Sequence, residues 1–129
     1  MADACYVVDN GIDLITAALA AGTNKYVAWG IGTTGAAVGD TAMQTASAPV
    51  NATAATGTAS QQQTTVADDT FRVVATITAG GALAITEVGV LNQATVSGAT
   101  MFSHGTFSAV NVSSGDSIEF TINHVFNQA

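Results

Sequence analysis

The most regular alternation of apolar and polar residues lies at the end of the chain. Four apolar residues and a histidine fall on alternate positions there, and the residues between them are mainly polar. A period of two is typical of a β-strand with one face toward a core, and a helix does not produce it. We therefore expect a strand over residues 117–126, whose inward face holds Ile118, Phe120, Ile122, His124 and Phe126.

A second alternating segment covers residues 70–78, with Phe71, Val73, Ala75 and Ile77 on one face. It is followed by a Gly-Gly pair and by the apolar residues 83–92, which predicts a β-hairpin with Gly80-Gly81 at its turn.

Two further segments have strand composition. Residues 26–31 are rich in aromatic and β-branched residues, which favour strands. Residues 100–112 predict one strand, or two strands broken at Gly105.

Helical periodicity is confined to residues 10–21, which carry one apolar stripe. Asp9 or Asn10 can cap the start of this helix, and Gly22 follows its end. About three turns of helix are marginal alone, so the helix must dock on other elements. The expected docking stripe consists of Ile12, Ile15, Ala18 and Leu19.

The intervening segments are less regular. Residues 32–41 read as a glycine-rich connection and residues 42–48 as a short or edge strand. Residues 49–69 are poor in large apolar side chains, so we expect an irregular excursion with at most one edge strand.

Short strands separated by turn signals at intervals of about 8–12 residues predict an all-β fold. We expect an antiparallel β-sandwich, jelly-roll-like, with one short N-terminal α-helix. The 129 residues suffice for one core and predict a single domain, with an N-terminal segment over residues 1–24 and the sandwich over residues 25–129.

The charge composition excludes some partners. Lys25 and Arg72 are the only basic residues against nine carboxylates, and the net charge of −7 argues against nucleic-acid binding. Charged residues make up 9% of the chain, so small neutral side chains must cover the surface; these lose little entropy when covered, which favours a protein that packs against other proteins.

Membrane insertion and secretion are not expected from the sequence. The chain has no apolar run of about 18–20 residues. Residues 1–15 hold three aspartates and no Lys or Arg, the opposite of a secretory signal. We therefore expect no membrane partner.

Residues 29–35, "WGIGTTG", contain the G-x-G-x-x-G spacing of dinucleotide-binding folds. Such a site needs a helix starting in the glycine loop and an acidic residue about 20 positions later. Gly39 interrupts any helix, and no carboxylate lies between Asp40 and Asp68. We interpret the motif as a strand end entering a close-packed turn, and we expect Gly32→Ala or Gly35→Ala to harm folding or assembly.

No residue pattern indicates catalysis or a cofactor. The chain has one cysteine and no G-x-S-x-G motif, so we expect no enzyme and no catalytic, cofactor-binding or metal residues. His124 is expected to be a core or interface imidazole with one hydrogen bond. The alternative is a metal site that combines His104 and His124 with some of Glu87, Asp116 and Glu119.

Two carboxylate positions carry structural expectations. Glu87 interrupts an apolar run, and we predict that it pairs with Arg72 across the Gly80-Gly81 turn; the alternative is an outward-facing carboxylate at a subunit contact. Asp68 and Asp69 read as a solvated loop that enters a strand.

Two blocks of the chain resemble a known class of proteins. They are "YVAWGIGTTGAAVGDTAM", residues 26–43, and "ITEVGVLNQATVSGATMFSHGTFSAVNVSSGDSIEFTINHVF", residues 85–126. Together they resemble small structural proteins of tailed bacteriophages, particularly capsid cement (decoration) proteins. Relatives often carry a basic residue before the second phenylalanine of the F-x-x-x-x-F strand, where this chain has His104. Residues 48–70 match nothing in that class.

The resemblance implies a jelly-roll-like protomer that forms homotrimers on the outer surface of the phage capsid. There it would bridge and stabilise subunits of the major capsid protein, after synthesis in the host bacterial cytoplasm. An acidic chain suits this outer location because packaged genome would repel it. The alternative is a tail-tip, fibre or baseplate module that binds a host receptor or joins tail parts.

Overall fold

The computed structural model describes residues 4–46 and 53–126, which form one helix and seven strands. In chain order these elements are α1 (Asp9–Ala21), β1 (Tyr26–Gly30), β2 (Ala55–Thr56), β3 (Thr58–Gln62), β4 (Thr70–Thr78), β5 (Leu83–Leu91), β6 (Met101–Val112) and β7 (Ser117–Val125).

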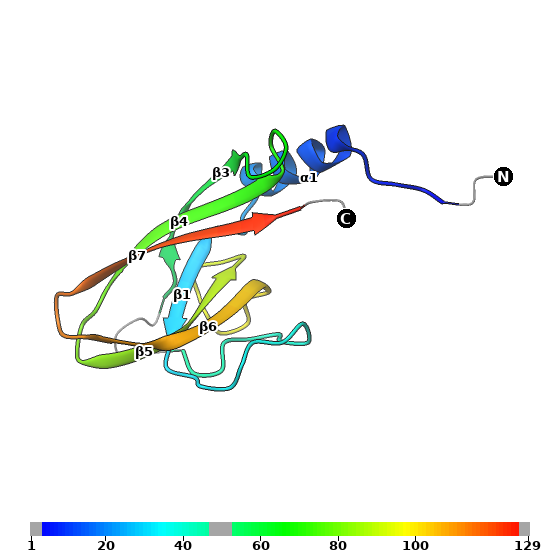
Figure 1. Ribbon diagram of the computed structural model, residues 1–129. Coiled ribbons are helices and arrows are strands. Elements are labelled where there is room, and N and C mark those ends of the chain that lie inside the picture. Colours follow the sequence, from blue (N-terminus) through cyan, green and yellow to red (C-terminus); the bar gives the residue numbers. More distant parts are fainter. Residues whose placement is uncertain (1–3, 47–52, 127–129) are drawn as a thin grey trace.

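The strands form two antiparallel sheets, which confirms the prediction of an all-β sandwich with one short helix. The first sheet has the order β2-β1-β5-β6 and the second β3-β4-β7. Figure 1 shows β4 and β7 above β5 and β6, with α1 beside the β3 end of the second sheet. The jelly-roll arrangement stays a prediction.

The core lies between the two sheets. Val27 and Trp29 of β1 are fully buried, and the expected alternation in β4 is confirmed because the four apolar residues of its predicted inward face are all buried. The inward face of β7 alternates as expected but is half-buried. The core residues of β4 and β5 and the β7 residues packed against them are Phe71, Val73, Ala75, Ile77, Ile85, Val90, Ile118, Phe120 and Ile122.

The predicted hairpin at Gly80-Gly81 is wrong. β4 pairs with β7, whereas β5 pairs with β1 and β6, so the two glycines carry the chain from one sheet to the other. Ala79 instead exchanges backbone hydrogen bonds with Gly115 and Asp116 of the turn before β7, at 2.8 and 2.7 Å. β4 and β5 therefore lie in different sheets on opposite sides of the core, where the apolar face of each strand covers that of the other.

Helix α1 has the predicted extent within one residue, but its cap differs. The N-cap residue is Val8, and no side chain caps the first turn. Gly22 follows the end as predicted, and its N–H donates to Leu19 O at 3.1 Å.

The docking face of α1 is rotated from the expected stripe. Ile12 and Thr16 are buried and Leu19 packs on the core, whereas Ile15 and Ala18 are exposed. Thr16 lies on the docking face because its hydroxyl has partners in β3 and in the loop before β4: it donates to Asp68 O at 2.7 Å and accepts from Gln61 Nε2 at 3.0 Å.

The segments predicted to be irregular are only partly so. Residues 31–46 contain no strand, and a single bridge joins Gly30 to Ala46. The expected excursion contains β2 and β3, two short edge strands rather than one. Residues 47–48 of the expected edge strand and residues 49–52 lie outside the described part of the chain. β6 runs through Gly105 as one strand.

Candidate functional site

A bulge in β5 turns Glu87 away from the core. Ile85 and Val88 both pack in the core although they are three positions apart, because the register against β6 shifts between Ile85 and Glu87. Such a bulge re-aims a side chain. Glu87 consequently lies on the outer face of the first sheet, beneath residues 31–46.

The carboxylate of Glu87 anchors this covering segment. Its Oε1 accepts the N–H groups of Gly32 at 3.1 Å and Thr45 at 2.7 Å, and its Oε2 accepts the N–H of Gln44 at 3.1 Å. The side chain is fully buried. Burial alone would raise the pKa of Glu87, but the N–H donors and His104 outweigh it, so the pKa lies below its usual range.

His104 on β6 bridges Glu87 to a second carboxylate. Its Nε2 lies 2.8 Å from Glu87 Oε2 and its Nδ1 lies 2.7 Å from Asp40 Oδ2. An ionised carboxylate only accepts, so both ring nitrogens donate and the ring is an imidazolium. Burial lowers the pKa of His104, but hydrogen bonding and attraction from Asp40 and Glu87 raise it above its ordinary value.

Asp40 completes this arrangement, which we call the Asp40–His104–Glu87 network. Its Oδ2 also accepts the N–H of Ala37 at 2.8 Å, and a quarter of its side chain is exposed. The Ala37 N–H and then His104 hold the pKa of Asp40 below its usual range. At neutral pH the two carboxylates and the imidazolium of this network together carry one net negative charge.

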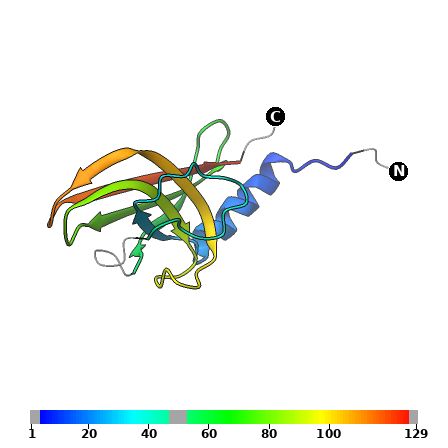
Figure 2. The same ribbon diagram turned by 90° about the horizontal axis from the view of Figure 1, so that it is seen from below.

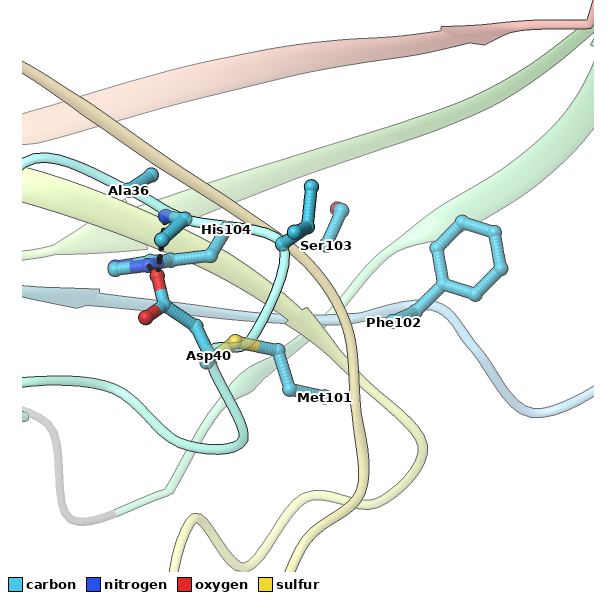
Figure 3. Close-up of a pocket in the computed structure, with 8 residues that line it drawn as sticks. Ala36, Asp40, Met101, Phe102, Ser103 and His104 are labelled. Atoms are coloured by element: carbon cyan, nitrogen blue, oxygen red, sulfur yellow. Dashed lines mark hydrogen bonds and ion pairs between the residues drawn. The ribbon is translucent and has the colours of Figure 1, made fainter.

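A pocket of about 360 Å³ opens beside this network (Figure 3). Figure 3 shows the Phe102 ring pointing away from Asp40 and His104. That ring contacts the rings of Phe71 and His124 inside the sandwich. The residues that line the pocket are Ala36, Ala37, Val38, Asp40, Met101, Phe102, Ser103 and His104.

His124 is a core imidazole, one of the two environments expected for it, but it has two hydrogen bonds rather than one. Its ring stacks on Phe71, its Nδ1 donates to Phe71 O at 3.1 Å, and its Nε2 accepts from Ser103 Oγ at 2.7 Å. These partners fix the neutral tautomer, and burial lowers the pKa of His124.

The alternative metal set is only partly brought together. His104 meets Glu87, but His124 faces the core, Asp116 accepts the Ser113 N–H in a turn, and Glu119 is exposed on β7. Across residues 4–46 and 53–126 no group of three or more potential ligands is arranged to hold a metal ion.

Both expectations for Glu87 are wrong. Arg72 lies on the other sheet, and its Nε donates to Asn123 Oδ1 at 2.8 Å. The alternative of an outward-facing carboxylate at a subunit contact fails because Glu87 faces outward from its sheet but residues 31–46 cover the carboxylate completely. Sequence order placed Arg72 and Glu87 on a hairpin that does not form.

Asp69 is buried rather than solvated, which corrects a second expectation. Its carboxylate accepts the N–H groups of Thr64, Thr65 and Val66 at 2.7, 2.7 and 3.0 Å. Burial raises the pKa of Asp69, but these N–H groups and the Thr70 hydroxyl bring it far below its usual range. Asp69 is therefore an internal anchor for the loop that precedes β4.

The glycine motif also binds an internal carboxylate, that of Glu87. Gly30 lies opposite Glu87 in the β1–β5 register, and the Gly32 N–H donates to Glu87. No helix follows the motif before residue 47. The anion that these glycines accommodate is thus a side chain of the protein, in agreement with our interpretation of a strand end entering a turn.

The sequence reasoning missed the pairing of His104 with Asp40 and Glu87. The one available signal was turn chemistry, because Gly39-Asp40-Thr41 matches Gly115-Asp116-Ser117 and marks Asp40 as a turn residue. Nothing local signals that the same carboxylate reaches a histidine 64 positions further along the chain.

Comparison with protein-family models, curated proteins and solved structures finds no match to this chain. No helix in the described residues is both long and apolar enough to cross a membrane.

Proposed function

We propose that this chain is a structural virion protein, a homotrimeric cement protein on the outer surface of a phage capsid that bridges major capsid protein subunits. The observation that carries the proposal is an apolar surface at the N-terminal end. We call residues 4–8 the arm; they extend away from the sandwich in two views (Figures 1 and 2).

The arm and helix α1 expose several large apolar side chains within a short stretch of the sequence. Tyr6 is 75% exposed and Leu14 71% exposed, and they are joined by Val7, Val8 and Ile15. Large apolar side chains that gather at one end of a protein and stay exposed favour an interaction site there. Residues 4–7 have no backbone or side-chain hydrogen bond to the described residues, so their polar groups are also available to a partner.

A second surface suits contact between copies. β6 and β7 are the edge strands of their sheets on the same side of the sandwich, where Phe107 packs against Phe120 with ring centroids 6.3 Å apart. These apolar rings are only half-buried. Burial of such a face in a trimer would remove more apolar area from water.

The test uses purified particles of the phage that encodes this chain. The proposal predicts a trimer by multi-angle light scattering, stoichiometric copies on each capsid, and loss of heat resistance when the protein is stripped from particles. One set of copies at the tail would overturn it and would favour the tail-tip, fibre or baseplate alternative.

A surface variant makes the test specific to the arm. Tyr6→Ser with Leu14→Ser should weaken rebinding to stripped capsids by about 10- to 100-fold, because two apolar anchors are lost. Ser114→Ala, in the exposed turn before β7, is the matched control and should rebind like the unaltered chain. Equal rebinding of both variants would contradict the role of the arm.

A further inference from the structure

Two aspartates close turns of the same kind, and one of them has a further partner. Asp40 accepts the N–H of Ala37, three residues earlier, at 2.8 Å, and Asp116 accepts the N–H of Ser113 at 2.8 Å. Asp116 completes its turn without a histidine among the described residues. The contact of Asp40 with His104 is therefore not required by the turn, and the two positions form a matched pair.

The pocket beside Asp40 has an unbalanced negative charge. The Asp40–His104–Glu87 network holds one net negative charge, and its exposed member, Asp40, lines the pocket. The chain's own cations are elsewhere: Arg72 bonds Asn123 on the other sheet, and Lys25 precedes the opposite end of β1 from residues 31–46. A cation that pairs with the exposed side of Asp40 would therefore come from another molecule.

The free oxygen of Asp40 selects the kind of cation. Oδ2 already accepts from His104 and Ala37, whereas Oδ1 has no hydrogen-bond partner among the described residues. A guanidinium fork pairs best with both oxygens of a carboxylate. One free oxygen fits a point-like ammonium group instead.

The walls of the pocket suit an alkyl stem. Ala36, Ala37 and Val38 of the covering segment and Met101 of β6 line the pocket, and Val38 is fully exposed. A lysine side chain packs its methylene groups on apolar walls and extends its ammonium group to a polar end. Glu87 holds the segment in place before any ligand arrives, which lowers the entropy lost on binding.

We propose that this pocket accepts a lysine side chain of a partner protein, with the ammonium group on Asp40 Oδ1 and the stem between Val38 and Met101. The inference rests on the proposed function in that it names a chemical feature of the shell surface to which the chain attaches. That surface would present a lysine within an apolar patch.

The test uses the isolated full chain and a small probe at neutral pH. N-acetyl-lysine-N-methylamide is titrated while the amide, methyl and imidazole resonances are followed by NMR. We expect saturable shifts at Ala37, Val38, Met101 and His104, with a Kd of about 1–30 mM. The norleucine derivative, which has the same stem without the amine, should bind at least about tenfold more weakly.

The variants follow from the matched aspartates. Asp40→Asn keeps an oxygen for the Ala37 N–H and His104 but loses the charge, and its lysine shifts should disappear. Asp116→Asn should bind the probe like the unaltered chain. Val38→Ser keeps the carboxylate and should weaken binding about two- to fivefold.

Three results would overturn the inference. They are absence of saturable shifts up to about 100 mM probe, equal shifts with the norleucine derivative, and unchanged binding by Asp40→Asn. Tighter binding of the arginine derivative would overturn the preference for ammonium. Because lysine binding is measured on the isolated chain and rebinding on capsids, failure of the lysine site and failure of the proposed function are distinguishable.

Discussion

At the scale of single residues, Glu87 attaches an irregular segment to a regular sheet. Three backbone N–H groups and one imidazolium converge on its buried carboxylate. A buried charge is tolerated when all its hydrogen-bonding capacity is used. Any substitution that removes the charge leaves His104 and the N–H donors with fewer acceptors, and buried unpaired donors are destabilising.

We expect Glu87→Gln to lower the free energy of unfolding by about 2–4 kcal/mol, because the amide loses one acceptor oxygen and the charge that balances His104. Urea denaturation followed by tryptophan fluorescence measures the change. Glu119→Gln removes an exposed carboxylate of β7 and should alter stability by less than about 0.5 kcal/mol. Equal effects of the two variants would contradict the anchoring role of Glu87.

At the scale of elements, residues 31–46 keep their shape without helix or strand because glycine allows close approach to the anchor. A Cβ on Gly32 would lie 2.5 Å from Gln44 Cβ and 2.8 Å from Glu87 Oε1. A Cβ on Gly35 would meet no atom within 4 Å, and Gly35 does not have a positive φ. The two glycines of the same motif therefore have different roles, and for folding the expectation at Gly35 has no structural support.

We expect Gly32→Ala to destabilise the fold by about 1–3 kcal/mol through overpacking against Gln44 and Glu87. Gly35→Ala should change stability by no more than about 0.5 kcal/mol and serves as the internal control. Thermal unfolding of both variants separates them. If Gly35→Ala were the more damaging change, residues 31–46 would not have the conformation described.

At the scale of the whole molecule, the two histidines change the stability with pH in opposite directions. The pKa of His104 is raised above 6.5 in the folded chain, so its contribution is fully present below pH 6.5 and is lost as pH rises through the folded pKa. The pKa of His124 is lowered below 6.5, so stability is lost as pH falls from 6.5 and the unfolded chain gains a proton. The two effects together place the greatest stability near neutral pH.

We expect the free energy of unfolding, measured in urea between about pH 5 and 9, to fall on both sides of neutrality. Each histidine adds at most about 1.4 kcal/mol per pH unit to the slope. His104→Gln should remove the alkaline decline and His124→Gln should reduce the acid decline. An alkaline decline that persists in His104→Gln would show that another group titrates there.

Local sequence patterns were enough to predict the strands β1, β4 and β7, the extent of α1 to within one residue, and the place of His124 on the apolar face of its strand. Side-chain periodicity records which face of an element is apolar, and this property depends on neighbours a few residues away. The alternation of Phe71 to Ile77 therefore needed no knowledge of the partner strand. Side-chain periodicity did not predict the rotated docking face of α1, because that face depends on the hydrogen bonds of Thr16 to Asp68 and Gln61.

The pairing of the strands, and the donors that each carboxylate meets, depend on how distant parts of the chain pack together. The chain crosses between sheets at Gly80-Gly81, so Glu87 faces residues 31–46 and His104 rather than Arg72. Pairing of strands and closure of long loops are set by the summed burial of distant faces, and no local pattern records that sum. For the same reason the contact between Asp40 and His104 could be found only after the chain was folded.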